Sequence, residues 1–156
     1  MAAPPQGSVH QDVSAYFGRP ATLWLAFTVV GVSTSDGYCQ TAIPSASPLP
    51  RRALVVDAQH DGRPEIVVST GREAFVYVMS GSTITRVTSP DGGFFSLDLG
   101  HRFDRGDAVG CADVGDGPHL VALLQLHDQH GAPTQPLTVK RTEVVLNGTT
   151  ASYGRT

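Results

Sequence analysis

The chain has 156 residues, of which 40% are hydrophobic and 16% are charged, and its formal net charge is -3 at pH 7. This composition suits one folded domain and excludes a disordered tail. The 11 Lys and Arg residues are scattered, which argues against a nucleic-acid partner. With 17 Gly, 11 Pro and few good helix formers, the composition favours an all-β protein that is rich in loops.

The N-terminal third of the sequence predicts a flexible start followed by a hairpin. Residues 1–20 are polar and interrupted by Pro and Gly, so we expect a flexible segment. Residues 21–33 and 38–43 are β-type apolar runs on either side of a turn at Ser35-Asp36-Gly37. Residues 44–50 are rich in Pro and Ser and predict a linker.

From residue 52 onward, short apolar runs alternate with turn sequences. The sequence predicts strands over residues 53–56, 65–70, 73–79, 83–88, 94–99, 108–112, 120–127 and 137–146. In total we expect about ten short antiparallel strands and no helix. The fold class is therefore all-β, with residues 21–156 forming a single compact domain.

Two segments of the chain share one pattern. Each has an apolar strand, an Asp, a turn that ends in Asp-Gly, a Pro and a second apolar strand, with the first Asp at Asp57 in one copy and Asp113 in the other. The chain between the copies holds about three further strands, which is close to the length of a four-stranded propeller blade. The sequence thus predicts blade-like units near residues 53–88 and 108–146.

The loop that begins at Asp57 has the spacing of a calcium loop. Calcium prefers several oxygen ligands at alternating positions around a sharp bend, which Gly62 permits here. The candidate ligands, at positions 1, 3, 5, 7 and 9, are Asp57, Gln59, Asp61, the carbonyl of Arg63, and Glu65. The alternative is an ordinary hairpin turn without an ion, in which Asp57 and Asp113 hydrogen-bond the amides of their own loops.

The run Asp-x-x-x-Asp-Gly-Arg-Pro-Glu-Ile-Val, preceded by an apolar strand, resembles the calcium loop of FG-GAP repeats. These repeats, also called VCBS-type repeats, build the blades of integrin-like β-propellers. The family's Phe-Gly and Gly-Ala-Pro pieces are absent, and Gln59 stands where the family prefers Asn or Asp. The resemblance implies calcium ligands at Asp57, Gln59, Asp61 and Glu65.

The second copy of the pattern is about two residues shorter and has His119 in place of the last carboxylate. There the resemblance implies Asp113 and Asp116 as ligands. A closed propeller usually has at least four blades, and this chain supplies two plus a hairpin. The alternatives for closure are a ring completed by two chains as a homo-oligomer, a barrel or sandwich, or a piece of a larger protein.

The remaining signals concern compartment and contacts. Cys39 and Cys111 predict one disulfide, with two free buried thiols as the alternative. The longest apolar run, residues 21–32, is shorter than the roughly 20 residues of a membrane-spanning helix. Phe94 and Phe95 follow a Gly-Gly turn, so we expect an exposed contact patch there.

Two functions fit this sequence. The first is a secreted or cell-surface binding domain, extracellular or in the cell envelope, with structural calcium and a protein or glycan ligand bound through loops on one rim. The second is a secreted hydrolase or enzyme accessory domain that uses the loops rich in His and Asp, including His127 and His130. No Gly-x-Ser-x-Gly motif indicates a catalytic serine.

Overall fold

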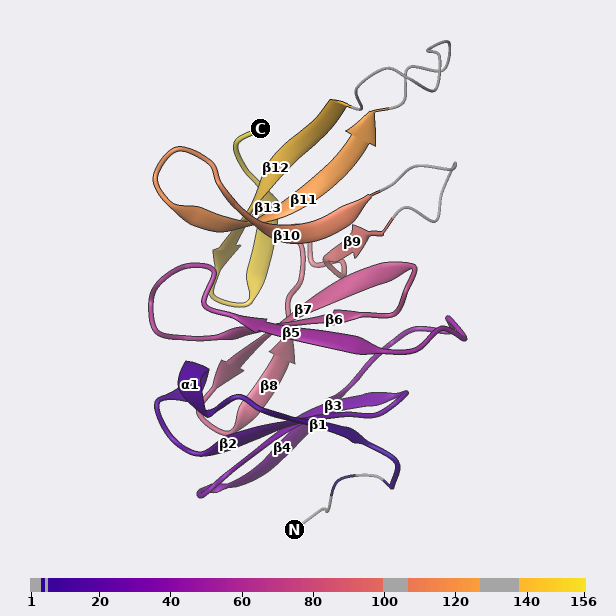
Figure 1. The fold of residues 1–156 in the computed structure, drawn as a ribbon, viewed down its shortest axis with the longest axis vertical. Helices are drawn as coiled ribbons and strands as arrows, with labels where there is room; N and C mark the ends of the chain where they lie inside the picture. The colour runs from indigo at the N-terminus through magenta and orange to yellow at the C-terminus, as the bar shows by residue number, and fades with distance from the viewer. Residues whose placement is uncertain (1–3, 5, 100–106, 127–137) are drawn as a thin grey trace.

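A computed structural model describes residues 4, 6–99, 107–126 and 138–156 of the chain. In these residues thirteen strands and one short helix form three antiparallel sheets, stacked in chain order along the long axis of the molecule (Figure 1). The predicted all-β, antiparallel, compact single domain is confirmed. The described strands do not close into a barrel.

The first sheet is a meander whose strand order equals the chain order. Its elements are β1 (Val9–Asp12), α1 (Ser14–Phe17), β2 (Ala21–Leu25), β3 (Val29–Thr34) and β4 (Gly37–Ala42). Two differences from the sequence prediction add strands. Within the segment expected to be flexible, β1 pairs with β2. The run predicted over residues 21–33 is divided into β2 and β3 by a turn in which Phe27 is exposed and Arg51 covers its ring at 4.0 Å.

The middle sheet has the same meander with an additional strand. Its elements are β5 (Arg52–Val56), β6 (Glu65–Ser69), β7 (Glu73–Ser80), β8 (Thr83–Arg86) and β9 (Ser96–Asp98). The short strands β8 and β9 both pair with β7, β8 along its C-terminal half and β9 along its N-terminal end. Together they form one divided edge strand.

The third sheet is again a meander. Its elements are β10 (Ala108–Asp113), β11 (Pro118–Leu126), β12 (Thr138–Asn147) and β13 (Thr150–Tyr153). β12 and β13 are joined at Asn147-Gly148, where Gly148 has a φ of 61°. The third sheet is tied to the middle one through Thr88, whose backbone exchanges hydrogen bonds with Thr149 and Ala151.

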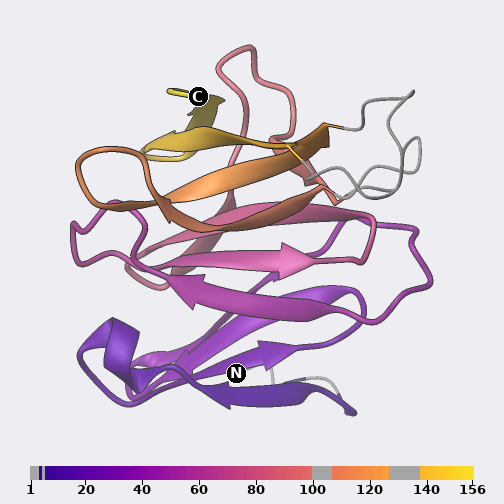
Figure 2. The same cartoon turned by 45° about the horizontal axis from the view of Figure 1, so that its top comes forward.

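The middle sheet lies between the other two (Figure 2). Both of its faces are buried, because alternate side chains of its strands enter different cores. Ile66, Val68, Phe75 and Tyr77 pack in the first core against residues of β2 and β3, such as Leu23 and Val32. The residues between them face the opposite way. They pack in the second core with apolar side chains of the third sheet, and they include Val67, Ala74 and Val76.

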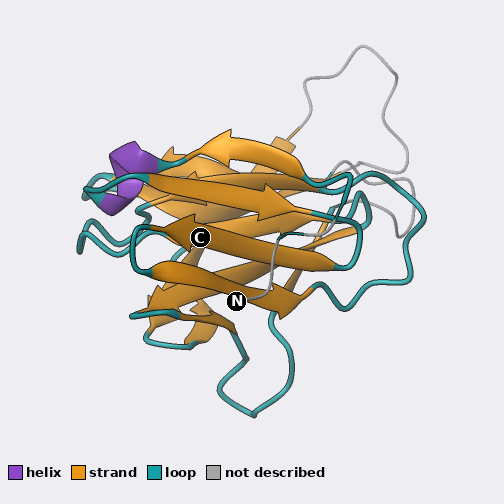
Figure 3. Cartoon of the chain, turned by 90° about the horizontal axis from the view of Figure 1, so that it is seen from below, coloured by secondary structure: helices purple, strands orange, loops and turns teal. Residues whose placement is uncertain are grey.

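The strands of the three sheets lie over one another, with α1 beside their ends (Figure 3). The loops that join the first two strands of each sheet therefore lie at the same side of the stack, on the left in Figure 1. We call this side the loop rim and its parts the first (residues 13–20), middle (57–64) and third (114–117) rim loops. The calcium ligands that the sequence predicts lie in or directly beside the middle and third rim loops.

Candidate functional site

The three rim loops end in the same way. Each has a glycine with positive φ one or two residues before a proline: φ is 64° at Gly18, 76° at Gly62 and 116° at Gly117. The proline directly precedes the second strand in the first two loops and is the first residue of that strand in the third. Positive φ is readily adopted by glycine and strained for residues with a Cβ. The loops therefore return the chain to the sheet by one shared device, although their lengths differ.

In the middle rim loop, carboxylates accept hydrogen bonds from the backbone of the same loop. Asp57 accepts from the amide of Asp61 at 3.1 Å and from that of Gly62 at 3.0 Å. Asp61 accepts from the amide of Arg63 at 2.8 Å. The predicted role of Asp57 in fixing the turn is confirmed.

Glu65, the first residue of β6, holds the start of the middle rim loop through its side chain. It is 1% exposed, and its carboxylate accepts hydrogen bonds from the amide of Ala58 at 2.8 Å and from Nε2 of Gln59 at 3.0 Å. Burial raises the pKa of Glu65, since desolvation penalises the charged form more than these donors stabilise it. The nearby charge of Asp57 acts in the same direction.

The third rim loop repeats the first part of this arrangement. Asp113 accepts hydrogen bonds from the amides of Gly115 at 2.7 Å and Gly117 at 3.1 Å, as the turn interpretation predicts. These two donors hold the pKa of Asp113 below its ordinary value. After the proline, however, His119 stands where Glu65 stands in the middle loop.

His119 belongs to a cluster of ionisable side chains that we call the third-loop network, formed by Asp116, His119, Glu143 and Arg155. Nε2 of His119 lies 2.9 Å from Asp116 Oδ1, and its Nδ1 lies 3.2 Å from Glu143 Oε1. Arg155 donates to both oxygens of Asp116, at 2.9 and 3.0 Å, and from Nε to Glu143 at 3.0 Å. Hydrogen bonds from Arg155 are the main reason that the pKa values of Asp116 and Glu143 are lowered.

The first rim loop was not recognised in the sequence. Asp12 accepts from the amide of Ser14 at 2.9 Å, and the Ser14 hydroxyl accepts from the amide of Ala21 at 3.0 Å, so the loop is again held by short polar side chains. The signal that identifies it is the tripeptide Gly18-Arg19-Pro20, which recurs as Gly62-Arg63-Pro64. The helical turn α1 within this loop obscures the likeness.

Neighbouring rim loops also touch. Nε2 of His60 lies 2.9 Å from the carbonyl oxygen of Pro118, which connects the middle and third rim loops. His60 has a φ of 54°, and no other described residue except glycine has a positive φ. The middle rim loop is thus connected to the start of β11, directly after the third rim loop.

The residues of the calcium site implied by the resemblance carry oxygen atoms that could bind calcium, but these atoms are not grouped around one position. Three of the predicted ligands carry carboxylates, namely Asp57, Asp61 and Glu65. All three carboxylates already accept hydrogen bonds from N–H groups of the middle rim loop. Among the described residues, no group of three or more His, Cys, Asp or Glu side chains is placed to hold a metal ion. In this arrangement the middle rim loop is held by its own hydrogen bonds, and calcium binding stays a prediction.

Two other predictions are corrected. The disulfide is not formed: Cys39 on β4 and Cys111 on β10 are both free, because they belong to the first and third sheets with the middle sheet between them. Of the predicted contact pair, Phe94 is 68% exposed beneath the Arg86 guanidinium, whereas Phe95 is 4% exposed. Phe95 packs in the second core and against the ring of Tyr153 at 5.5 Å.

No family model matches the sequence, and no curated protein or solved structure in the comparisons is significantly similar to it. No helix among the described residues is long and apolar enough to cross a membrane. His127 and His130, which the hydrolase hypothesis uses, lie outside the described residues.

Proposed function

We propose that this chain is a non-catalytic binding domain of the extracellular space or cell envelope, and that it contacts a protein or glycan through the loop rim. The observation that carries the proposal is the alignment of three similarly closed loops on one side of the stack. In or beside each loop, a short polar side chain accepts a hydrogen bond from a backbone amide and so braces the loop. A braced loop loses little conformational entropy when it binds, which favours recognition.

The rim offers polar groups of both signs to a ligand. Exposed side chains on it include His60, Asp61, Arg63 and Asp116. Mixed polar surfaces of this kind suit hydrogen bonding to glycan hydroxyls or to the polar rim of a protein interface. Binding residues often stand on loops held by a rigid scaffold, and here the scaffold is the stack of sheets.

The resemblance to FG-GAP or VCBS-type repeats supports the same function. Three successive meanders, each with a loop between its first two strands that turns at a glycine of positive φ, are compatible with a row of such blades. The first meander adds a third unit to the two that the sequence suggests. Membership of that family remains part of the proposal.

Binding can be tested on a printed glycan array and on a panel of immobilised extracellular proteins. We expect the wild type to be retained on at least one probe and the Asp61→Asn variant to be retained less. Asp91→Asn is the matched control, because Asp91 likewise accepts the amide two residues later, at 3.1 Å from Gly93, but lies outside the rim. Retention of neither protein on any probe, or loss of retention in the control alone, contradicts the proposal.

The structural calcium has a separate test. If calcium binds the middle rim loop, millimolar calcium raises the melting temperature, and Asp61→Ala abolishes the rise. If calcium produces no rise, the loop is held by its hydrogen bonds alone. Neither result decides whether the rim binds a protein or glycan.

A further inference from the structure

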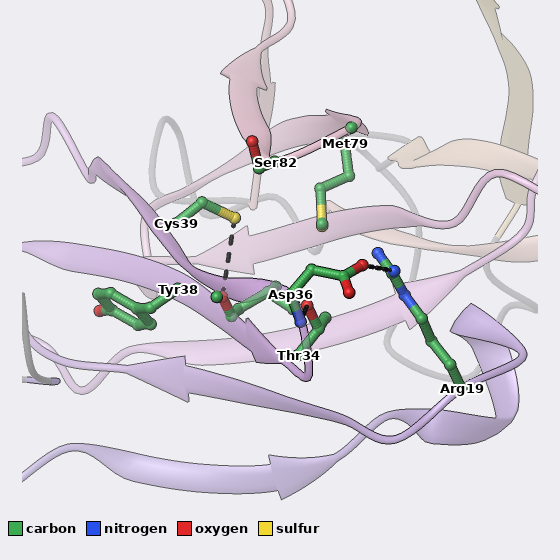
Figure 4. A pocket seen from close by; sticks show the side chains of 10 residues that line it. Arg19, Thr34, Asp36, Tyr38, Cys39, Met79 and Ser82 are labelled. Carbon is green, nitrogen blue, oxygen red and sulfur yellow. Dashed lines mark hydrogen bonds and ion pairs between the residues drawn. The ribbon is translucent and has the colours of Figure 1, made fainter. Parts of the chain in front are cut away.

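A cleft opens at the loop rim between the first and middle sheets. It consists of two adjoining hollows of about 370 and 330 Å³, which share Arg19, Met79 and Gly81 in their linings. Figure 4 shows the larger hollow, with the side chains of Arg19, Asp36 and Met79 around it. We call the two hollows together the inter-sheet cleft.

Two arginines from matching positions line the smaller hollow. Arg19 and Arg63 are the central residues of the two Gly-Arg-Pro sequences, and both border this space. The stacking of the sheets thus brings side chains from two rim loops to one cleft. The walls also include the apolar side chains of Phe17 and Met79 and the polar residue Ser80.

The positive charge in the cleft is only partly balanced. Arg19 forms an ion pair with Asp36, which lines the larger hollow. The guanidinium of Arg63 has no hydrogen bond or ion pair with any other residue that the structure describes. The neighbouring Asp61 accepts the Arg63 amide and does not line the cleft. One acid therefore faces two arginines, in a chain whose net charge is -3.

We propose that the inter-sheet cleft binds a small oxyanion, with Arg63 and Arg19 as its donors. Guanidinium groups present planar pairs of N–H donors that match the oxygens of carboxylate, sulfate and phosphate groups. This site goes beyond the proposed function, because a free anion can occupy it whether or not the rim binds a macromolecule.

The test is calorimetric titration of the full chain with sodium sulfate, sodium phosphate and sodium acetate against a sodium chloride background of constant ionic strength. We expect saturable binding of at least one oxyanion, and about tenfold weaker binding by Arg63→Gln. The matched control is Arg72→Gln, which removes an equal charge from an exposed residue between β6 and β7, outside the loop rim. Its affinity should equal that of the wild type.

A variant with the opposite expected effect sharpens the test. Asp36→Asn removes the acid that pairs with Arg19, so we expect the oxyanion to bind several-fold more tightly. Equal melting temperatures of the variants in chloride show that they are folded. Sulfate stabilises most proteins without binding at a specific site, so a rise in melting temperature does not serve as the test. The proposal is overturned if titration shows no saturable binding, or if Arg63→Gln binds the anion as tightly as the wild type. The ranking of the three anions identifies the chemical group.

Discussion

The middle and third rim loops begin alike and are anchored by different chemistry. In both, an aspartate accepts two amides of its own loop. Beyond the proline, the middle loop is held by the buried carboxylate of Glu65, which accepts only from uncharged N–H groups. The third loop is held by a network in which the buried carboxylate of Glu143, 7% exposed, pairs with the half-exposed Arg155. The same turn is thus compatible with an anchor held by amides or with an anchor held by an arginine.

The position of each sheet explains the difference. Glu65 lies on the middle sheet, where the third sheet covers it, so its charge requires hydrogen bonds from within the loop. His119 alternates with Leu120, which packs in the second core, and therefore lies on the outer face of the third sheet. No further sheet of the described chain covers that face, and a network of four ionisable side chains lies there instead.

The largest expected effect is the loss of the buried anchor. Glu65→Ala leaves the buried amide of Ala58 without an acceptor, and we expect it to lower the free energy of unfolding by about 2–3 kcal/mol in urea denaturation. Glu65→Gln keeps one acceptor oxygen and should lose less. Glu143→Ala should lose less than Glu65→Ala, and a larger loss there would reverse the comparison.

The glycines that close the two loops give a second, smaller effect. Gly62→Ala and Gly117→Ala place a Cβ where φ is 76° and 116°, with no other atom within 4 Å, so any loss is conformational. We expect each to lower the unfolding free energy by about 1–2 kcal/mol. Gly93→Ala, which lacks a positive φ, is the control and should change it little.

The two anchors should respond to pH in opposite directions. The pKa of Glu65 is raised above 4.5, so its favourable contribution is complete below that pH and is lost as pH rises through the folded-state value. The pKa values of Asp116 and Glu143 are lowered, so their contribution is present above the ordinary carboxyl range and is lost as pH falls through the lowered values. Urea denaturation between about pH 3 and pH 7 measures both.

Two glutamine variants isolate these contributions. The stability difference between the wild type and Glu65→Gln should shift against the wild type as pH rises, and that between the wild type and Glu143→Gln should shift in its favour. Parallel slopes for the two variants would falsify the distinction between an anchor held by uncharged donors and an anchor paired with Arg155.

The smallest effect concerns the contact between the loops. His60→Ala removes the contact with the Pro118 carbonyl, which is solvent-exposed, and should lower the unfolding free energy by about 0.5 kcal/mol. His60→Gly also loses the contact but relieves the positive φ of 54°, so it should be at least as stable as His60→Ala. Thermal melting of the three proteins checks this order.

Sequence reasoning succeeds where the determinants are local. The alternation of short apolar runs with Gly and Pro identifies the fold class, and the Asp57 and Asp113 turns are predicted because their partners lie within five residues. The first rim loop is missed because α1 interrupts the pattern. The third-loop network is missed because Arg155 and Asp116 are far apart in sequence. The disulfide is wrong because cysteine count carries no information about which sheets the two thiols occupy.

Each sheet is a meander of consecutive strands, and this has a consequence for biosynthesis. Such local pairings form quickly, so a hairpin can appear while the nascent chain is still leaving the ribosome. Leu23 and Val32, however, stay exposed to solvent until Ile66 and Tyr77 have emerged to cover them. The chain therefore forms its two hydrophobic cores in order from the N-terminus. A stalled product that ends before β6 exposes the apolar face of the first sheet to chaperones.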